Sequence, residues 1–167
     1  MKLSSHEEYG LRCLLQVARR SATGSATIPE ISRNEGISIP YVAKLMRMLR
    51  RGGFVRAARG KIGGYTLALP PERICISDAL TVLGGRMYED DFCERHSGSQ
   101  DSCAHSTHCS IRSLWRAVQE AVDSVLRKTT IRDLLRSDSE TVVKALEGGL
   151  IPLHECPNGG HGSPISK

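Results

Sequence analysis

The chain has 167 residues, which suits one domain of ordinary size or a small domain with an appended helix. Aromatic residues make up only 4% of it, so the core must be mostly aliphatic. The start of the sequence lacks the apolar stretch of a secretory signal, and no uncharged apolar run reaches the roughly 18 residues that a membrane helix needs. These features predict a cytoplasmic protein that does not act at a membrane.

Positive charge is concentrated in the first half of the chain. Residues 1–73 contain 13 Lys or Arg against 5 Asp or Glu, a balance of +8, whereas residues 74–167 contain 10 against 13, a balance of −3. Between Glu35 and Glu72 there are seven basic residues and no acidic one. A field of one sign on one module indicates a polyanionic partner, most simply nucleic acid. A charge run can also be only a solvated helix face, so the position of these residues has to decide.

The first predicted elements are two helices. Ser4 and Ser5 each stand three residues before a glutamate, which is the capping-box pattern, and apolar residues then recur at helical spacing. This predicts a helix over about residues 5–20. A second helix is predicted over residues 28–35, beginning at Thr27, which has a glutamate three residues later.

A third helix and two short strands complete the predicted first domain. Gly36 ends the second helix, and Ser38 begins a third over residues 39–51. Two helices joined by a tight glycine turn form a helix-turn-helix. Residues 54–58 and 64–70 then predict two strands around the turn RGKIGG, which is a wing. The predicted fold is therefore mainly α with a small β wing: a winged helix-turn-helix domain followed by a long helix.

This order places the basic residues on the elements that contact DNA in such folds. A recognition helix lies in the major groove with its N-terminal residues against base edges, and here these are Ser38, Pro40, Tyr41, Ala43 and Lys44. Cations farther along the helix suit phosphate contacts: Arg47, Arg50 and Arg51. At the wing tip, Arg59 and Lys61 suit a narrow minor groove. We therefore predict double-stranded DNA as the partner.

The second half begins with a short predicted helix and continues with a long one. Ser77 begins the first, over residues 77–85. From Cys109 onward one apolar stripe runs over about five turns, and Thr130 caps a further short helix; the stripe is Ile111, Leu114, Trp115, Val118, Val122, Val125 and Leu126. Such a stripe needs a partner surface, either the N-terminal domain of its own chain or its twin in a homodimer. Because winged-helix regulators read two half-sites, the pattern favours a homodimer.

The chain divides into four predicted parts. Residues 1–85 form the winged helix-turn-helix domain, and residues 86–108 form a cysteine-rich loop. Residues 109–147 contain the dimerisation helix and short C-terminal helices. Residues 148–167 are rich in Gly and Pro, which predicts a disordered tail.

The predicted loop contains three of the six cysteines in a polar setting where no core could form. Their spacing is Cys-x9-Cys-x5-Cys, unlike the Cys-x2-Cys knuckle of many structural zinc sites. Zinc could still bind the three thiolates with one of the nearby histidines, His96, His105 or His108. The same thiolates could hold an iron-sulfur cluster, and from this chemistry alone both metals remain open. No nucleophile and base can be paired from the spacing, which argues against an enzyme and against a small-molecule substrate.

Three stretches carry a family resemblance: MKLSSHEEYGLRCLLQVAR, GISIPYVAKLMRMLRRGGFVRAARGKIGGYTLA, and the three cysteines before SIRSLWRAVQEAVDSVLRKTTIRDLL. Together they resemble the Rrf2 family of bacterial winged-helix regulators, which includes IscR, NsrR and RirA. The match covers residues 1 to about 136. It implies a homodimeric transcription regulator in which three loop cysteines bind an iron-sulfur cluster that controls DNA affinity, and it favours such a cluster over zinc.

The resemblance implies a ligand set. Cys93, Cys103 and Cys109 match the family's three thiolates, although the first gap is longer than the family pattern. Some members add a histidine three residues after the last cysteine, but this chain has Arg112 there. Others use an acidic residue from the first helix of the partner subunit, and Glu8 stands at that position.

Glu8 has an alternative role and two possible substitutes. It could simply close a capping box with Ser5, and Glu7 or His6 could act as the ligand in its place. Members with a two-iron cluster can add a histidine four residues after the acid, where this chain has Arg12. This departure favours 4Fe-4S over 2Fe-2S.

Overall fold

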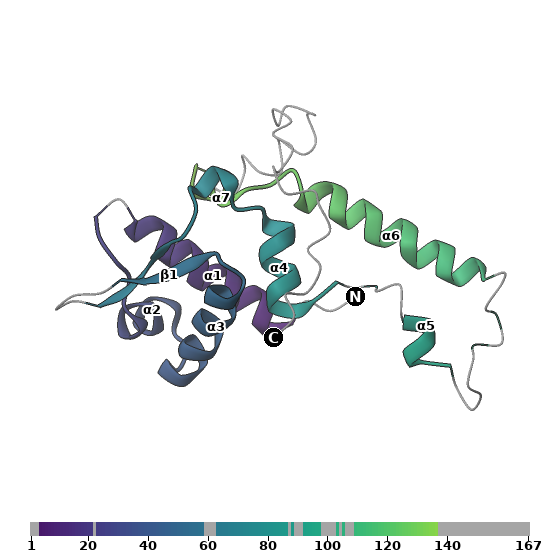
Figure 1. Ribbon diagram of the computed structural model, residues 1–167, viewed down its shortest axis with the longest axis horizontal. Coiled ribbons are helices and arrows are strands. Elements are labelled where there is room, and N and C mark those ends of the chain that lie inside the picture. Colours follow the sequence, from purple (N-terminus) through teal and green to yellow (C-terminus); the bar gives the residue numbers. More distant parts are fainter. Residues whose placement is uncertain are drawn as a thin grey trace.

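The computed structural model describes residues 4–21, 23–58, 63–86, 88, 92–97, 103, 105 and 109–136. In chain order the elements are α1 (Ser5–Arg20), α2 (Ile28–Glu35), α3 (Ile39–Arg51), β1 (Val55–Ala58), β2 (Gly64–Leu67), the 3-10 helix η1 (Pro71–Arg73), α4 (Ile76–Gly84), α5 (Phe92–Arg95), α6 (Ser110–Leu126) and α7 (Ile131–Arg136) (Figure 1). A mostly helical chain with one small antiparallel sheet confirms the predicted fold class.

The start of α1 is fixed by a capping box. The Ser4 hydroxyl accepts the backbone N–H of Glu7 at 3.3 Å, and the Glu7 carboxylate accepts the N–H of Ser4 at 2.7 Å. Each bond satisfies a donor that a helix N-terminus leaves unpaired. The pair in use is thus Ser4 with Glu7, so the alternative pair of Ser5 with Glu8 is wrong and Glu8 has no capping role.

The helix-turn-helix forms as predicted. Thr27 and Glu30 form a second capping box at the start of α2, and Gly36 ends that helix with φ 66°, a left-handed conformation that favours glycine. Ser38 occupies the N-cap position of α3, but its side chain makes no capping hydrogen bond. The position predicted for Ser38 is therefore correct, while the capping bond is absent.

The wing is a two-stranded antiparallel sheet. β1 pairs with β2 from Val55 opposite Leu67 to Ala58 opposite Gly64. The Ala26 backbone adds an isolated bridge to Tyr65, through hydrogen bonds of 2.8 and 2.9 Å. This bridge ties the segment before α2 to the base of the wing. The tip of the wing, residues 59–62, lies outside the described residues.

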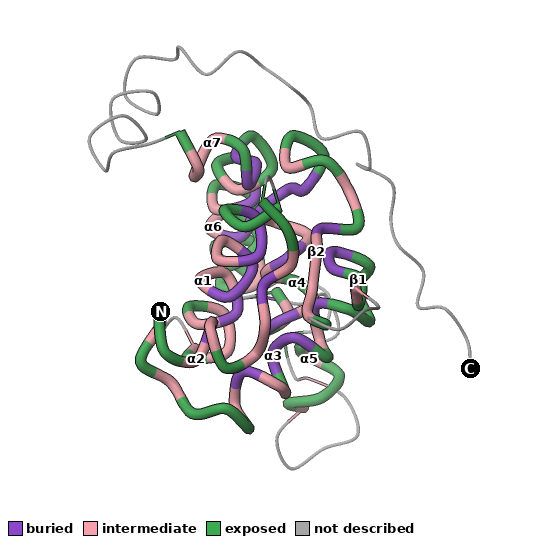
Figure 2. The backbone as a smooth tube through the Cα atoms, turned by 90° about the vertical axis from the view of Figure 1, so that its left-hand side faces the viewer, coloured by how far each residue is buried: buried purple, intermediate pink, exposed green. Residues whose placement is uncertain are grey.

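An aliphatic core joins α1, α3 and α4, and Figure 2 shows buried positions gathered along α1 and α3. Burying each large aliphatic side chain contributes about 1.5–3 kcal/mol. The largest side chains in this core that are almost fully buried are Leu14, Val17, Ile31, Val42, Leu45, Met46, Leu49, Val55, Ile74 and Ile131. Gly10 allows α1 and α4 to approach closely, because a Cβ there would overlap the side chain of Leu83.

The start of α4 differs from the prediction. Cys75 is the N-cap residue, and Ser77 lies inside the helix with its hydroxyl bonded to the Asp78 carboxylate at 3.3 Å. The cause is tertiary: Ile76 donates its N–H to the carbonyl of Thr129, so pairing with a distant segment fixes where the helix begins. The cap predicted at Thr130 is confirmed, since its hydroxyl accepts the N–H of Asp133 at 3.3 Å at the start of α7.

α6 extends away from the body formed by α1 to α4 and α7 (Figure 1). Its buried side chains are polar, Gln119 and Asp123, whereas much of the predicted apolar stripe faces outward. Its exposed members are Ile111, Leu114, Trp115 and Val125. Among the described residues, these four side chains are not part of the core that the N-terminal domain forms. Among the described helices, none is long and apolar enough to cross a membrane.

Candidate DNA-binding face and cysteine site

The outer face of α3 carries the predicted recognition residues. Spacings of four, three and four residues place four of them on one face of the helix: Pro40, Lys44, Arg47 and Arg51. All four side chains are exposed. The opposite face is buried in the core through Val42, Leu45, Met46 and Leu49. Arg50 and Ser38 are also exposed. Because the apolar face fixes the rotation of α3, its cationic face points to solvent.

Two of the predicted base-contact residues are bound to α1. The Tyr41 hydroxyl donates to Ser5 Oγ at 3.2 Å, and its ring lies edge-on to His6 with the ring centres 5.6 Å apart. Lys44 Nζ lies 2.8 Å from His6 Nε2. The first turn of α1 is therefore part of the surface around the recognition helix. Arg59 and Lys61, the predicted wing-tip contacts, lie outside the described residues.

α1 also holds the end of α2. Arg12 Nε lies 2.6 Å from a carboxylate oxygen of Glu35, and Gln16 donates to the other oxygen. The Glu35 carboxylate raises the pKa of Arg12, whose guanidinium also lies 5.4 Å from the ring centre of Tyr9. In the sequence Arg12 is only a departure from the two-iron pattern. In the structure it joins α1 to the helix-turn-helix.

Cys93 lies in α5, a short helix that the sequence did not predict. Its sulfur is 4.0 Å from the Tyr88 hydroxyl and interacts with the side chain of Arg112. Burial raises the pKa of Tyr88, and the contact with Cys93 acts in the same direction. The contact with Cys93 also raises the pKa of Arg112. The Arg112 guanidinium and the Tyr88 hydroxyl are therefore both neighbours of this sulfur.

Cys109 is the N-cap residue of α6, and its sulfur accepts the backbone N–H of Arg112 at 3.4 Å. The sulfur thus lies at the positive end of the helix dipole, an environment that suits a negatively charged ligand atom. Arg112 contacts Cys93 with its side chain and Cys109 with its backbone. It therefore brings together the first and the last cysteine of the predicted loop, which are 16 residues apart in the sequence.

The remaining candidates for metal ligands are Cys103 and three histidines. Cys103 is half-buried and His105 is exposed, and His108 lies outside the described residues. His96 stacks on Phe92 with ring centres 4.3 Å apart, and its Nδ1 lies 2.9 Å from the Phe92 carbonyl oxygen. In the described part of the chain, no three Cys, His, Asp or Glu side chains already form a metal site.

Glu8 lies on the first turn of α1 and is exposed. Within the ranges that the structure describes, its carboxylate makes no hydrogen bond or ion pair, while the neighbouring Glu7 is used by the capping box. His6, the other possible substitute, contacts Lys44. Of the three candidates for the fourth ligand, Glu8 is thus the one whose side chain has no structural role among the described residues.

Sequence reasoning missed a polar network at the start of the loop. Asp123 of α6 accepts hydrogen bonds from Arg86 at 2.5 Å, from Arg127 at 2.8 Å and from Gln119 at 2.8 Å. Gln119 in turn accepts the backbone N–H of Tyr88 at 2.8 Å. The signal was present, because Gln119 and Asp123 are four residues apart and lie beside the apolar stripe, not on the solvated face.

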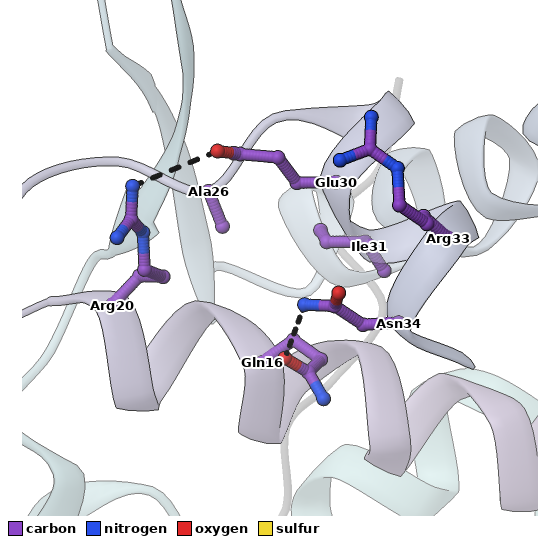
Figure 3. A pocket seen from close by; sticks show the side chains of 7 residues that line it. All are labelled: Gln16, Arg20, Ala26, Glu30, Ile31, Arg33 and Asn34. Atoms are coloured by element: carbon purple, nitrogen blue, oxygen red, sulfur yellow. Dashed lines mark hydrogen bonds and ion pairs between the residues drawn. The ribbon is translucent and has the colours of Figure 1, made fainter.

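A shallow pocket between α1 and α2 does not form a second candidate site (Figure 3). Four of its polar side chains pair with one another: Arg20 lies 3.6 Å from Glu30, and Asn34 donates to Gln16 at 3.2 Å. The lining residues are Gln16, Arg20, Ala26, Glu30, Ile31, Arg33 and Asn34. These internal pairs leave few convergent polar groups to orient a ligand.

Comparisons with known proteins give one consistent result. The model of the Rrf2 family, described as an iron-dependent transcriptional regulator, matches residues 3–137. The transcriptional regulator IscR of Aliivibrio salmonicida is 29% identical over 165 residues, 95% of each chain. The protein rrf2 of Nitratidesulfovibrio vulgaris is 32% identical over 139 residues, 83% of this chain and 90% of its own.

Solved structures agree with these sequence matches. IscR of T. potens superposes with a TM-score of 0.67 at 28% identity, covering 84% of this chain and 90% of its own. CymR of Bacillus subtilis, described as the global cysteine regulator, superposes with a TM-score of 0.66 at 29% identity, covering 83% and 99%. The winged-helix architecture is thus similar to that of solved regulators, and the matched relatives are named as regulators and not as enzymes.

Proposed function

Because the chain belongs to the Rrf2 family and is a DNA-binding transcription regulator, we propose that it acts in the cytoplasm as a homodimer whose operator affinity is controlled by an iron-sulfur cluster. The observation that supports DNA binding most directly is the exposed cationic face of α3, held outward by the buried face of the same helix. Its residues would contact base edges and phosphates, and Arg59 and Lys61 of the wing would enter a minor groove.

The outward apolar stripe of α6 supports the homodimer. Ile111 is 63% exposed and Leu114 is 57% exposed, which is unusual for large aliphatic side chains arranged on one helix face. A second copy of α6 would cover this stripe. Two-fold symmetry would place two recognition helices on half-sites about 34–36 Å apart. In this proposal residues 109–147 form the dimerisation part, and residues 86–108 form the cluster loop.

The ligands we propose are Cys93, Cys103, Cys109 and Glu8 of the partner subunit. Sulfur donors are the ligands that iron-sulfur clusters require, and a negatively charged set suits the cationic surroundings provided by Arg112. The convergence of Cys93 and Cys109 on Arg112 supports this fit. A 4Fe-4S cluster is favoured over 2Fe-2S because Arg12, where the two-iron pattern has a histidine, is engaged with Glu35. When bound, the cluster would supply an iron centre that nitric oxide, oxygen or iron limitation can alter.

In this proposal the cluster ligands connect the loop to the dimer helix α6 and to the DNA-binding face of α3. Cys109 is directly followed by α6, so the loop and the proposed dimer helix are continuous. Glu8 lies on the first turn of α1, whose neighbouring residues contact α3. A carboxylate is a harder and more exchangeable ligand to iron than a thiolate. Loss of that ligand would release a link between subunits and so alter the spacing of the two recognition helices.

Anaerobic purification tests the proposal. We expect iron and acid-labile sulfide in the protein, with the visible absorbance of a cluster, and different DNA affinities of the loaded and apo forms. Stoichiometric zinc in a colourless protein would instead identify the loop as a structural zinc site on a DNA-binding protein. That outcome would contradict the sensing function and leave the DNA-binding function in place.

A further inference from the structure

The contact between His6 and Lys44 joins two elements with different roles. Lys44 lies at the centre of the exposed face of α3, flanked at helical spacing by Pro40 and Arg47, while His6 lies on the first turn of α1. The ammonium nitrogen is 2.8 Å from His6 Nε2, within hydrogen-bond distance. A lysine ammonium has only donors, so in this contact Lys44 donates and the His6 ring nitrogen accepts.

His6 is itself held in place by aromatic contacts. Its ring lies edge-on to Tyr41, at 5.6 Å between centres, and the Tyr41 ring lies edge-on to Tyr9 at 6.1 Å. The Tyr41 hydroxyl is bonded to Ser5. Edge-to-face pairs of this kind have a preferred geometry, which restricts the rings. The acceptor for Lys44 is therefore a side chain of restricted orientation outside the helix-turn-helix.

We propose that His6 is a positioning residue for DNA recognition: it holds the Lys44 ammonium over the outer face of α3 before DNA is bound. The proposal rests on the DNA-binding face proposed above and adds to it a residue on α1. A free lysine side chain loses much rotamer freedom when it makes a fixed contact, and an already positioned one loses less. His6 uses one of the three ammonium donors, so two remain for DNA.

The expected effect follows from the net strength of one hydrogen bond. Without its acceptor, Lys44 would sample many rotamers, and the affinity for a specific sequence should fall by about two- to tenfold. The affinity for a scrambled sequence should change less, because non-specific binding depends mainly on cations near the phosphates, and Lys44 keeps its charge in His6→Ala. The loss should depend on Lys44, since His6 acts through it.

A double-mutant cycle tests this dependence. The probes are a duplex selected by the wild-type protein from a random-sequence library and a scrambled duplex of the same length, with binding followed by fluorescence anisotropy. The variants are His6→Ala, Lys44→Ala and the double variant. His6→Gln is the conservative variant, because its amide oxygen can accept the same bond. Thr23→Ala is the control, because Thr23 is an exposed neutral residue just beyond the other end of α1 and, among the described residues, its hydroxyl bonds only to the Arg20 carbonyl. Thermal unfolding of each variant confirms that it is folded.

Three results support the proposal when found together: His6→Ala weakens binding to the selected duplex, His6→Gln restores part of the loss, and His6→Ala has no effect in the Lys44→Ala background. A loss that persists without Lys44 would overturn the proposal, because His6 would then contact DNA directly. Tighter binding by His6→Ala, or no change, would also overturn it. If the wild-type protein selects no duplex, the proposed DNA-binding function itself fails, which is a separate outcome.

Discussion

Arg86 and Asp123 form an ion pair, with 2.5 Å between Arg86 Nη2 and Asp123 Oδ2, that connects the residues just after α4 to the last turn of α6. Asp123 is only 8% exposed, and it also accepts from Arg127 and Gln119. A buried carboxylate requires such partners to offset its lost hydration. The network therefore fastens the start of the cysteine loop to the helix that follows the loop.

Asp123→Ala should lower the free energy of unfolding by about 1–3 kcal/mol, because it takes the acceptor from the buried Gln119 amide and removes the carboxylate that contacts Arg86 and Arg127. The arginine side chains are about half exposed, so water replaces part of the loss. Urea unfolding followed by circular dichroism measures the change. Glu120→Ala, on the exposed face of the same helix, is the control and should change stability by less than about 0.5 kcal/mol. Equal effects of the two substitutions on the free energy of unfolding would show that the network does not stabilise the fold.

Local patterns predicted most of the fold, because they depend on neighbouring residues. The box at Thr27, the turn at Gly36 and the apolar face of α3 were all predicted from spacing alone. The start of α4 was not, since its position depends on the Thr129 carbonyl more than 50 residues later in the chain. Helix α5 was missed because its four residues are too few to show periodicity.

The candidate site was predictable in its residue types and not in its contacts. The cation spacing on α3 and the three cysteines were visible in the sequence. The engagement of Lys44 by His6 and the approach of Cys93 to Arg112 depend on how distant elements pack. A single sequence has no local signal for such pairs.

The loop cysteines should be required for the cluster. Replacing Cys93, Cys103 or Cys109 singly by Ala should abolish or strongly reduce bound iron and sulfide, measured after anaerobic reconstitution with ferrous iron and sulfide. Cys13→Ala is the matched control: its side chain is fully buried in the core, and burial raises its pKa to about 12, so it is a poor thiolate ligand. A full cluster in Cys103→Ala would show that the ligand set is wrong.

Glu8→Ala should leave a folded protein with a more labile cluster, because three thiolates remain. The decay of visible absorbance in air measures this, and we expect faster decay than in the wild type. Glu7→Gln is a suitable control, because glutamine preserves the capping box while removing the charge. Slower or unchanged decay in Glu8→Ala would exclude Glu8 as a ligand, and faster decay only in Glu7→Gln would assign that role to Glu7.

Trp115→Glu should convert the proposed homodimer to a monomer, because it places a charge within the apolar stripe that a second α6 would cover. Sedimentation velocity over a range of concentrations measures the change. Ala117→Glu introduces the same charge at an exposed position on another face of α6 and should leave the dimer intact. If Trp115→Glu remains dimeric, the stripe is not the dimer interface.

Replacing the cations of the DNA-binding face one at a time by Ala should weaken DNA binding in different ways. Loss of Arg50 or Arg51, proposed to contact phosphates, should weaken binding to all sequences and reduce the salt slope by about one unit. Loss of Lys44 should cost about 1–3 kcal/mol mainly on the specific duplex, since a base-edge contact discriminates sequence. Loss of Arg59 should weaken sites with A·T-rich flanks most, because a narrow minor groove concentrates negative potential.

The decisive comparison is the operator affinity of loaded and apo protein at several salt concentrations, for the wild type and for Arg59→Ala. The substitutions of Lys44, Arg50, Arg51 and Arg59 do not affect a proposed cluster ligand, so each variant should bind as much iron and sulfide as the wild type. If the cluster acts through the spacing of the two recognition helices, its loss should change specific affinity much more than non-specific affinity, because only specific binding requires both half-sites in register. Equal affinity of the loaded and apo wild-type forms would mean that the loop holds a structural centre and not a switch.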